Sequence, residues 1–406
     1  MNKLFCFLFL LLCFFDCLAQ QSTVSNPSDQ WPIAKVDSSK QRDAIDYWYR
    51  LLKKKDSEAK RQKSQRLNFS LVPAFGYSLS TGFAVDLTGN VAFFTSTKHT
   101  ENLSAMDAEA IYDTKNQLII ISRSEIWGVE NDYKLVTDLR YEHYPTDTYG
   151  LGTSTTTATD NPIVYSYNRA YVTGYKKILT DFYGGVGYNL DYHYNIKQSG
   201  TANNTVSEFT LYGGQTSTIS SGVTVNLLFD NRRNPINPLN GGYALISYRE
   251  SPTFLGSDNN WQELQMDFRR YFRVSPNNNN VLAFWSIMEF TNGNVPYFDL
   301  PSTGNDTYNN SGRGYQEERF RGKDMLYVEG EFRFGITKNG FMGGVVFSNA
   351  ESFTGFQNNR FEKIAPAAGT GLRFKINKHS DTNVCLDYAR GIDGSNGLFV
   401  NLGEVF

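Results

Sequence analysis

The sequence has few cysteines and no long apolar run beyond its first residues, and each shortage excludes a class of protein. Four cysteines occur among 406 residues, and three of them lie before residue 18. If that leading segment is removed, Cys385 stands alone, which excludes an intrachain disulfide and a cysteine-based metal site. After residue 19 no apolar run reaches the ~18 residues of a transmembrane helix.

Signals for catalysis are also missing. The histidines 99, 143, 193 and 379 are scattered, with no paired metal-ligand spacing, and neither a GxSxG elbow nor a P-loop occurs. A net charge of −2 gives no basic surface for nucleic acid. We therefore expect no enzyme activity, no cofactor, no metal and no nucleic-acid partner.

Aromatic residues, by contrast, are abundant. The chain has 30 Phe and 25 Tyr, yet its mean hydropathy is −0.42. A membrane β-barrel combines these properties, because its outer band and aromatic girdles are apolar while its lumen is polar.

The first 19 residues have the pattern of a secretory signal peptide. Lys3 precedes an apolar run over 4–15, and Cys17-Leu18-Ala19 supplies a cleavage site. Phe15 and Asp16 before Cys17 do not suit lipidation, so the mature chain is expected to begin near Gln20. The signal implies export, and we expect a bacterial outer-membrane location.

Residues 20–66 form the expected periplasmic N-terminal segment, which is helical in part. Residues 53–66 contain seven basic and two acidic residues, and Tyr47, Trp48 and Tyr49 precede them. Two interpretations stay open: a helix lying on anionic lipid headgroups, or a solvated charged helix leading into the first strand.

From residue 67 to 406 the hydrophobic pattern alternates with period two. In 324–336, Leu326 and Val328 fall on one face, and Glu329 and Glu331 on the other. We expect an all-β fold, a transmembrane antiparallel barrel of about 16 strands with one face toward a hydrated lumen. Residues 206–215 are apolar enough to be an extra strand extension. The longer gaps all follow odd-numbered strands, at the expected extracellular end: 145–163, 197–220, 251–260, 293–323 and 349–367.

The last ten residues contain a polar Asn401, then Gly403, then a terminal aromatic Phe406. This pattern resembles the β-signal of outer-membrane barrels, which suits strand addition by backbone hydrogen bonds. The alternative is an ordinary last strand that happens to end in Phe. In both cases we expect the last strand to reach Phe406 and to meet the first strand at a seam.

Three motifs resemble the BamA/TamA-type outer-membrane assembly factors, also called the bacterial surface antigen family. Arg313-Gly314-Tyr315 lies in the long connection between the eleventh and twelfth strands. Asp230, Arg232 and Pro235 resemble the family's Asp-x-Arg periplasmic turn, and 73–82 resembles the opening hairpin of shorter members.

The resemblance implies a 16-stranded barrel whose sixth extracellular loop folds into the lumen, where its arginine pairs with acidic wall residues. Glu329, Glu331 and Asp387 are the candidate partners, and the alternative is a solvent-exposed Arg313. The family usually has an aspartate where this chain has Ser348-Asn349.

The family's role implies insertion or translocation of protein, or lipid, at the outer membrane. Only some 45 residues are expected between the signal and the barrel, too few for a POTRA domain, and no patatin-like lipase domain occurs. We therefore expect outer-membrane lipids as partners, together with a separate periplasmic protein or an outer-membrane complex. The alternative is a loop-plugged pore or a structural subunit of such a complex.

Overall fold

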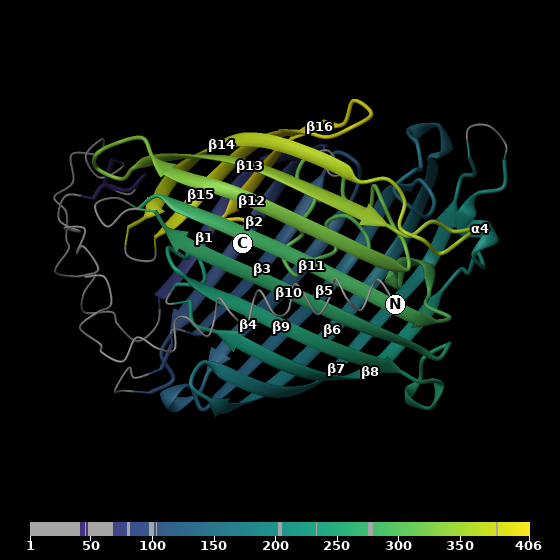
Figure 1. The fold of residues 1–406 in the computed structure, drawn as a ribbon, viewed down its shortest axis with the longest axis horizontal. Coiled ribbons are helices and arrows are strands. Elements are labelled where there is room, and N and C mark those ends of the chain that lie inside the picture. The colour runs from purple at the N-terminus through teal and green to yellow at the C-terminus, as the bar shows by residue number, and fades with distance from the viewer. Residues whose placement is uncertain are drawn as a thin grey trace.

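The sheet follows the chain from strand to strand. The computed structural model describes residues 41–44, 46–47, 68–78, 82–96, 101–102, 104–201, 205–232, 234–274, 279–378 and 381–406. Within these residues, 16 strands form one antiparallel sheet in sequence order, each paired with the next (Figure 1). The expected all-β barrel of about 16 strands is confirmed.

The strands are long, as strands that cross a membrane at a tilt must be. Their bounds in chain order are β1 (Asn68–Ser78), β2 (Gly82–Phe93), β3 (Ser104–Asp113), β4 (Leu118–Trp127), β5 (Tyr133–Thr148), β6 (Asn161–Leu179), β7 (Phe182–Gln198), β8 (Thr218–Asp230), β9 (Gly241–Ser251), β10 (Trp261–Arg273), β11 (Val281–Gly293), β12 (Asp324–Gly335), β13 (Met342–Phe353), β14 (Ala365–Asn377), β15 (Thr382–Arg390) and β16 (Asn396–Leu402).

The faces of the strands are reversed relative to a soluble protein. In β8, Val223, Val225 and Leu227 are exposed, whereas Thr224 and Asn226 between them are buried. A soluble sheet would turn its apolar residues toward a core. An apolar exterior around a polar interior instead suits lipid outside the barrel and a hydrated lumen within it.

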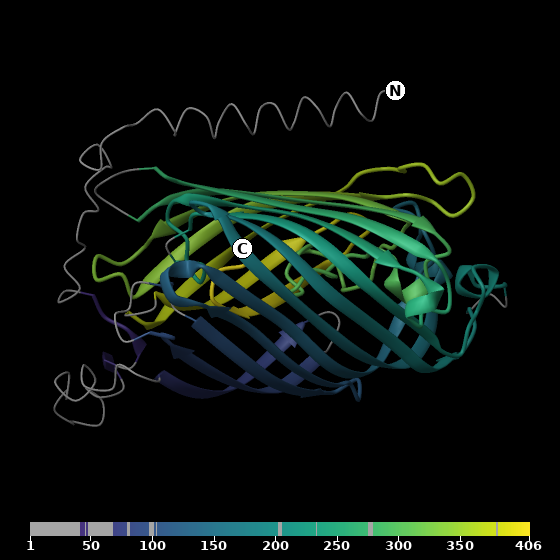
Figure 2. The same cartoon turned by 90° about the horizontal axis from the view of Figure 1, so that it is seen from below.

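The four longest connections, residues 149–160, 199–217, 294–323 and 354–364, all follow odd-numbered strands. Odd-numbered strands end on the side of the barrel that carries α4 (Glu208–Leu211), opposite the first described residues (Figure 2). Residues 206–215, which are apolar enough for an extra strand extension, instead contain α4. Ser207 caps the helix by accepting a hydrogen bond from the Thr210 N–H.

The seam between β1 and β16 differs from every other neighbouring pair. The two strands lie side by side, but among the described residues no hydrogen-bonded ladder joins them. β16 also ends at Leu402, so the expectation that it reaches Phe406 was wrong. Gly403 has a φ of +90°, a conformation that only glycine adopts readily, and it turns the chain into the lumen. Phe406 is buried there with 3% of its surface exposed.

The N-terminal described residues lie against two of the short turns. The backbone N–H of Lys378 donates to Asp43 at 3.1 Å, and its Nζ donates to Asp46 at 3.1 Å. The Tyr47 ring lies 4.7 Å from that of Phe341. Both aspartates are buried. The described part of the N-terminal segment, residues 41–44 and 46–47, therefore contacts the turns that join β12 to β13 and β14 to β15.

Several sequence predictions fall on residues outside the described ranges. These are the signal peptide over 1–19 and most of the segment over 20–66, including its basic run over 53–66. None of the described helices is long and apolar enough to cross a membrane.

Candidate functional site

The connection between β11 and β12, residues 294–323, lies inside the barrel, and we call it the lumen loop (Figure 2). Tyr315, Phe320 and Arg321 in this loop are each at most 2% exposed. A loop in water would leave such large side chains accessible. Their burial shows that the loop is packed against the inner wall.

Arg313 is the main contact between the lumen loop and the wall. Its guanidinium donates to Asp387 at 2.5 Å, to Glu331 at 2.7 Å and to Glu329. It also lies 3.6 Å above the centre of the Phe347 ring. The structure thus brings Arg313 together with all three wall residues named from the sequence. Buried charges of this kind are tolerable only while they are paired.

These pairs are part of a closed ring of alternating charges, which we call the ion ring. Its longest link joins Arg333 to Glu404 at 3.6 Å. Each side chain in the ring is at most 6% exposed, and the ring joins the lumen loop, three wall strands and the residues after β16. The sequence analysis did not identify Glu404 as a site residue. In order, the ring runs through Arg313, Glu331, Arg333, Glu404, Arg373 and Asp387, and returns to Arg313.

Asn349 on β13 belongs to the pair Ser348-Asn349, which stands where the resembled family usually has an aspartate. Its amide donates to the carbonyl oxygen of Arg313 at 2.9 Å. An amide can donate to this carbonyl, whereas an ionised carboxylate could not. Asn349 therefore holds the backbone of the motif, and the carboxylates on β12 and β15 hold its side chain.

The two residues after Arg313 are positioned by close packing. Gly314 has a φ of +113°, and a Cβ atom there would lie 2.7 Å from that of Ala367. The Tyr315 hydroxyl donates to the carbonyl oxygen of Pro366 at 2.7 Å and accepts from the Ile392 N–H at 3.1 Å. Glycine and tyrosine are thus both needed for the loop to lie against β14.

Gly371 makes room for the Asp387 carboxylate, which gives a first prediction. In Gly371→Ala the added carbon overlaps Oδ1 of Asp387 and lies 2.7 Å from the carbonyl oxygen of Leu386. We expect Asp387 to lose its place beside Arg313 and the free energy of unfolding to fall by about 1–3 kcal/mol. Urea titration of the barrel folded in detergent measures this. Gly174→Ala is the control, because its added carbon has no atom within 4 Å; equal midpoints for the two variants would contradict the prediction.

The lumen loop is also attached to the opposite wall, on β5. Arg140 donates to the carbonyl oxygen of Thr307 at 2.8 Å and to the Asn309 side chain at 3.1 Å. The Tyr144 hydroxyl donates to Glu317 at 2.9 Å. The loop therefore spans the lumen from wall to wall.

A second buried group of charges, the Asp191 cluster, was not predicted as a site. Asp191 accepts hydrogen bonds from Arg249 at 2.7 Å, Tyr167 at 2.5 Å and Tyr171 at 2.8 Å. Asp191 lies on β7 and is 1% exposed. Its pairing with Arg249 depends on the register of β7, β8 and β9, which the alternation does not give.

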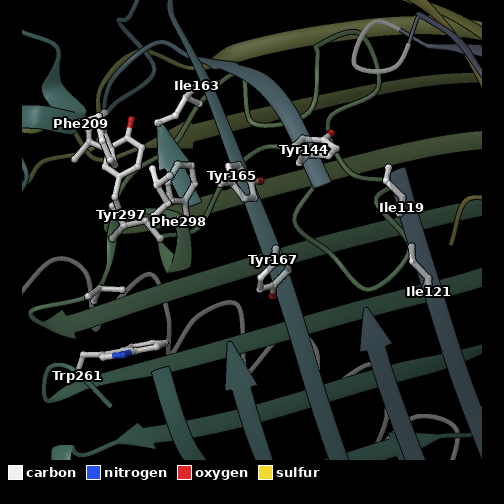
Figure 3. Close-up of a cluster of buried hydrophobic side chains, with 14 residues drawn as sticks. Ile119, Ile121, Tyr144, Ile163, Tyr165, Tyr167, Phe209, Trp261, Tyr297 and Phe298 are labelled. Carbon is white, nitrogen blue, oxygen red and sulfur yellow. The ribbon is translucent and has the colours of Figure 1, made fainter. Parts of the chain in front are cut away.

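Aromatic side chains fill the lumen between the Asp191 cluster and α4. Phe209, Tyr297 and Phe298 lie together beside the strand that carries Tyr165 and Tyr167 (Figure 3). The rings of Tyr165 and Phe298 are 4.4 Å apart, and those of Phe209 and Tyr297 are 5.2 Å apart. This packing occupies part of the lumen near the end of the barrel that carries the long connections.

The Asp-x-Arg motif forms a rigid turn after β8. Arg232 donates to both carboxylate oxygens of Asp230, at 2.9 and 2.8 Å. Pro235 follows, and the carbonyl oxygen of Ile236 accepts the Glu404 N–H at 3.0 Å. The structure therefore brings the turn motif against the residues after β16, a contact that the sequence did not predict.

The two described histidines lie on different strands. His193 is buried and stacks on Tyr167 with ring centres 4.2 Å apart, and His143 lies on β5. Among the described residues no group of three or more His, Cys, Asp or Glu side chains is placed to hold a metal ion.

Taken together, the fold and the site define an outer-membrane-type β-barrel whose lumen is filled by its own loop. No protein family and no curated protein matches the chain by sequence. Solved structures do match. BamA from Haemophilus ducreyi lacking POTRA domains 1–3 aligns with a TM-score of 0.52 and 15% identity, over 83% of this chain and 70% of that chain.

Two CdiB structures are similar to the same degree. The Escherichia coli protein aligns with a TM-score of 0.55 and 10% identity over 83% of this chain. The Acinetobacter baumannii protein gives 0.52 and 13% over 84%. The chain spans 62% and 60% of these two CdiB chains. At these identities the likeness establishes the fold alone: the chain has the barrel fold of the BamA and CdiB structures.

Proposed function

We propose that the protein is a bacterial outer-membrane barrel that inserts or translocates polypeptides, or lipids, at the seam between β1 and β16. The missing ladder at this seam is the observation that carries the proposal, because every other neighbouring pair in the described sheet is hydrogen-bonded. An unpaired strand edge is a template on which another strand can add. The resemblance to BamA and CdiB barrels supports the outer-membrane location and the general role.

The filled lumen supports a route at the seam rather than through the centre of the barrel. Arg313 attaches the lumen loop to β12 and β15, and Arg140 attaches it to β5. A central passage would require both attachments to break, which would leave buried charges without partners. Movement at the seam requires neither.

The proposed function requires two kinds of partner, the surrounding lipids and a separate protein. Outer-membrane lipids contact the apolar exterior. A separate periplasmic protein or outer-membrane complex supplies the substrate and is recruited through residues 41–66. The buried start of that segment at Asp43 and Asp46 supports a fixed position beside the rim. The proposal includes no cofactor, no nucleic acid and no catalytic residue.

A disulfide across the seam tests the proposal. Cysteines replacing Phe69 on β1 and Asn401 on β16 should lower outer-membrane protein levels and slow growth under oxidising conditions, and reductant should reverse both effects. The control is a cysteine pair at Leu386 and Val400, which are already partners in the β15–β16 ladder. If the seam is crosslinked and neither readout changes, the seam does not open during function.

That negative result would favour a second candidate, a loop-plugged pore or a structural subunit of an outer-membrane complex. The attachment of the lumen loop to two walls favours this candidate independently, because a rigid filled barrel suits a scaffold.

A further inference from the structure

Residues 403–406, here called the lumen tail, are bound along their whole length by side chains from other parts of the chain. The Glu404 carboxylate accepts from Arg373 at 2.8 Å and from Asn383 at 2.7 Å. The Val405 carbonyl oxygen accepts from Asn310 of the lumen loop at 2.8 Å. Each residue in turn is thus recognised, as a peptide is in a binding site.

An aromatic pocket holds the last of these residues. The Phe406 ring stacks on Trp285 with ring centres 5.1 Å apart, and the Tyr271 ring is 6.0 Å away. Arg333 donates to the Phe406 main-chain oxygen at 2.8 Å and lies 5.4 Å from the centre of its ring. Stacking and the charged donor together specify an aromatic residue at this position.

The site is held in shape by contacts that do not involve the lumen tail. Glu331 binds Arg333, and Asp387 binds Arg373 at 2.5 Å. Trp285 donates to Asp267 at 2.9 Å. Nη1 of Arg333 is buried and has no hydrogen-bond partner among the described residues, so the site has a donor left for a further acceptor.

Three further bonds attach the first two residues of the lumen tail to the barrel. The Gly403 N–H donates to the Asn383 carbonyl oxygen at 2.8 Å, the Cys385 thiol donates to the Gly403 carbonyl oxygen at 2.9 Å, and the Glu404 N–H donates to the Ile236 carbonyl oxygen at 3.0 Å. It follows β16, the shortest described strand, which has a ladder with β15 but none with β1. Gly403 with its φ of +90° forms the turn into the lumen. The site lies at the end of the barrel with the short turns, because the Glu404 N–H bonds Ile236 in the β8–β9 turn.

We infer that this part of the inner wall is a peptide-binding site and that the lumen tail is its displaceable resident ligand. The class of ligand is an extended peptide with an acidic residue two positions before an aromatic one. The acidic residue binds Arg373 and Asn383, and the aromatic residue binds Trp285 and Arg333. A role for the site in receiving substrate rests on the proposed function, but the binding itself does not.

The first test vacates the site in the full-length chain. Glu404→Arg with Phe406→Ala repels the lumen tail from Arg333 and Arg373 and leaves the wall intact. A fluorescent Gly-Glu-Val-Phe peptide should bind this variant at least about tenfold more tightly than the unaltered barrel, by anisotropy in detergent. The peptides Gly-Gln-Val-Phe and Gly-Glu-Val-Ala should each bind about tenfold more weakly. No gain in binding by a variant that runs as a folded barrel on gels would overturn the inference.

A second test keeps the site nearly native. Val405 is buried, so in Val405→Cys with Cys385→Ser a water-soluble maleimide should react slowly. Excess Gly-Glu-Val-Phe should displace the lumen tail and raise the labelling rate several-fold, whereas Gly-Gln-Val-Ala should not. An unchanged rate would show that the tail is a fixed part of the barrel. Both tests use purified protein, so their outcome is independent of the seam disulfide in cells.

Discussion

Replacing Arg313 with alanine is expected to lower the free energy of unfolding of the barrel by about 3–5 kcal/mol. The substitution leaves Glu329, Glu331 and Asp387 buried beside one another without the cation they share. Breaking a buried pair from one side is costly because the remaining charges cannot reach water. The lumen loop should also lose its attachment to β12 and β15.

Two measurements check the Arg313 prediction. Urea titration in detergent should show the lower midpoint, and planar-bilayer recordings should show a larger current once the loop is loosened. Arg360→Ala is the matched control, because that side chain is exposed on the β13–β14 connection. Arg313→Lys should give an intermediate result. The ammonium group keeps the positive charge, but it lacks the planar guanidinium that can donate to several carboxylates at once. Unchanged midpoint and current in Arg313→Ala would mean that this arginine does not hold the loop.

Replacing Asp191 with alanine should be similarly severe, about 3–5 kcal/mol. The change removes the only carboxylate that bonds Arg249 within the described residues, and leaves the hydroxyls of Tyr167 and Tyr171 without their acceptor. Because the cluster joins β6, β7 and β9, we expect the loss to weaken pairing on the side of the barrel away from the ion ring.

The control for Asp191 is an exposed ion pair of the same chain. Asp132 lies 3.2 Å from Lys176, and their side chains are 55% and 53% exposed. Asp132→Ala should change the free energy of unfolding by about 0–1 kcal/mol. The double variant Asp191→Ala with Arg249→Met should recover part of the loss, because the stranded charge is gone. Equal effects of the two single alanine variants would show that burial of Asp191 does not govern its contribution.

The sequence predicted features that depend on local periodicity. Alternation placed Glu329 and Glu331 on the inner face because side chains in a strand change face at every residue. Strand parity likewise placed the longest connections at one end. The loop that enters the lumen was predicted in another way, by the resemblance of the motif around Arg313 to that of a known family.

Features that depend on contacts between distant residues were missed. Nothing near Phe406 in the sequence shows that the chain leaves the strand at Gly403. That turn depends on groups far away in the sequence: an aromatic ring on β11, an arginine on β12 and a carbonyl oxygen in the β8–β9 turn. The link between Asp191 and Arg249 was missed for the same reason. Alternation gives the face of each residue, but only the register gives its neighbour.

The two attachments of the lumen loop have a consequence for the order in which the chain assembles. The contact between Arg140 and Thr307 joins residues 167 positions apart, whereas Arg313 and Glu329 are 16 positions apart. Contacts between distant positions form late because closing a long stretch of chain costs more entropy. The loop should therefore meet β12 early and β5 last. The loop spans the lumen only after the intervening strands are in place, so in a half-built barrel it is attached to one wall alone.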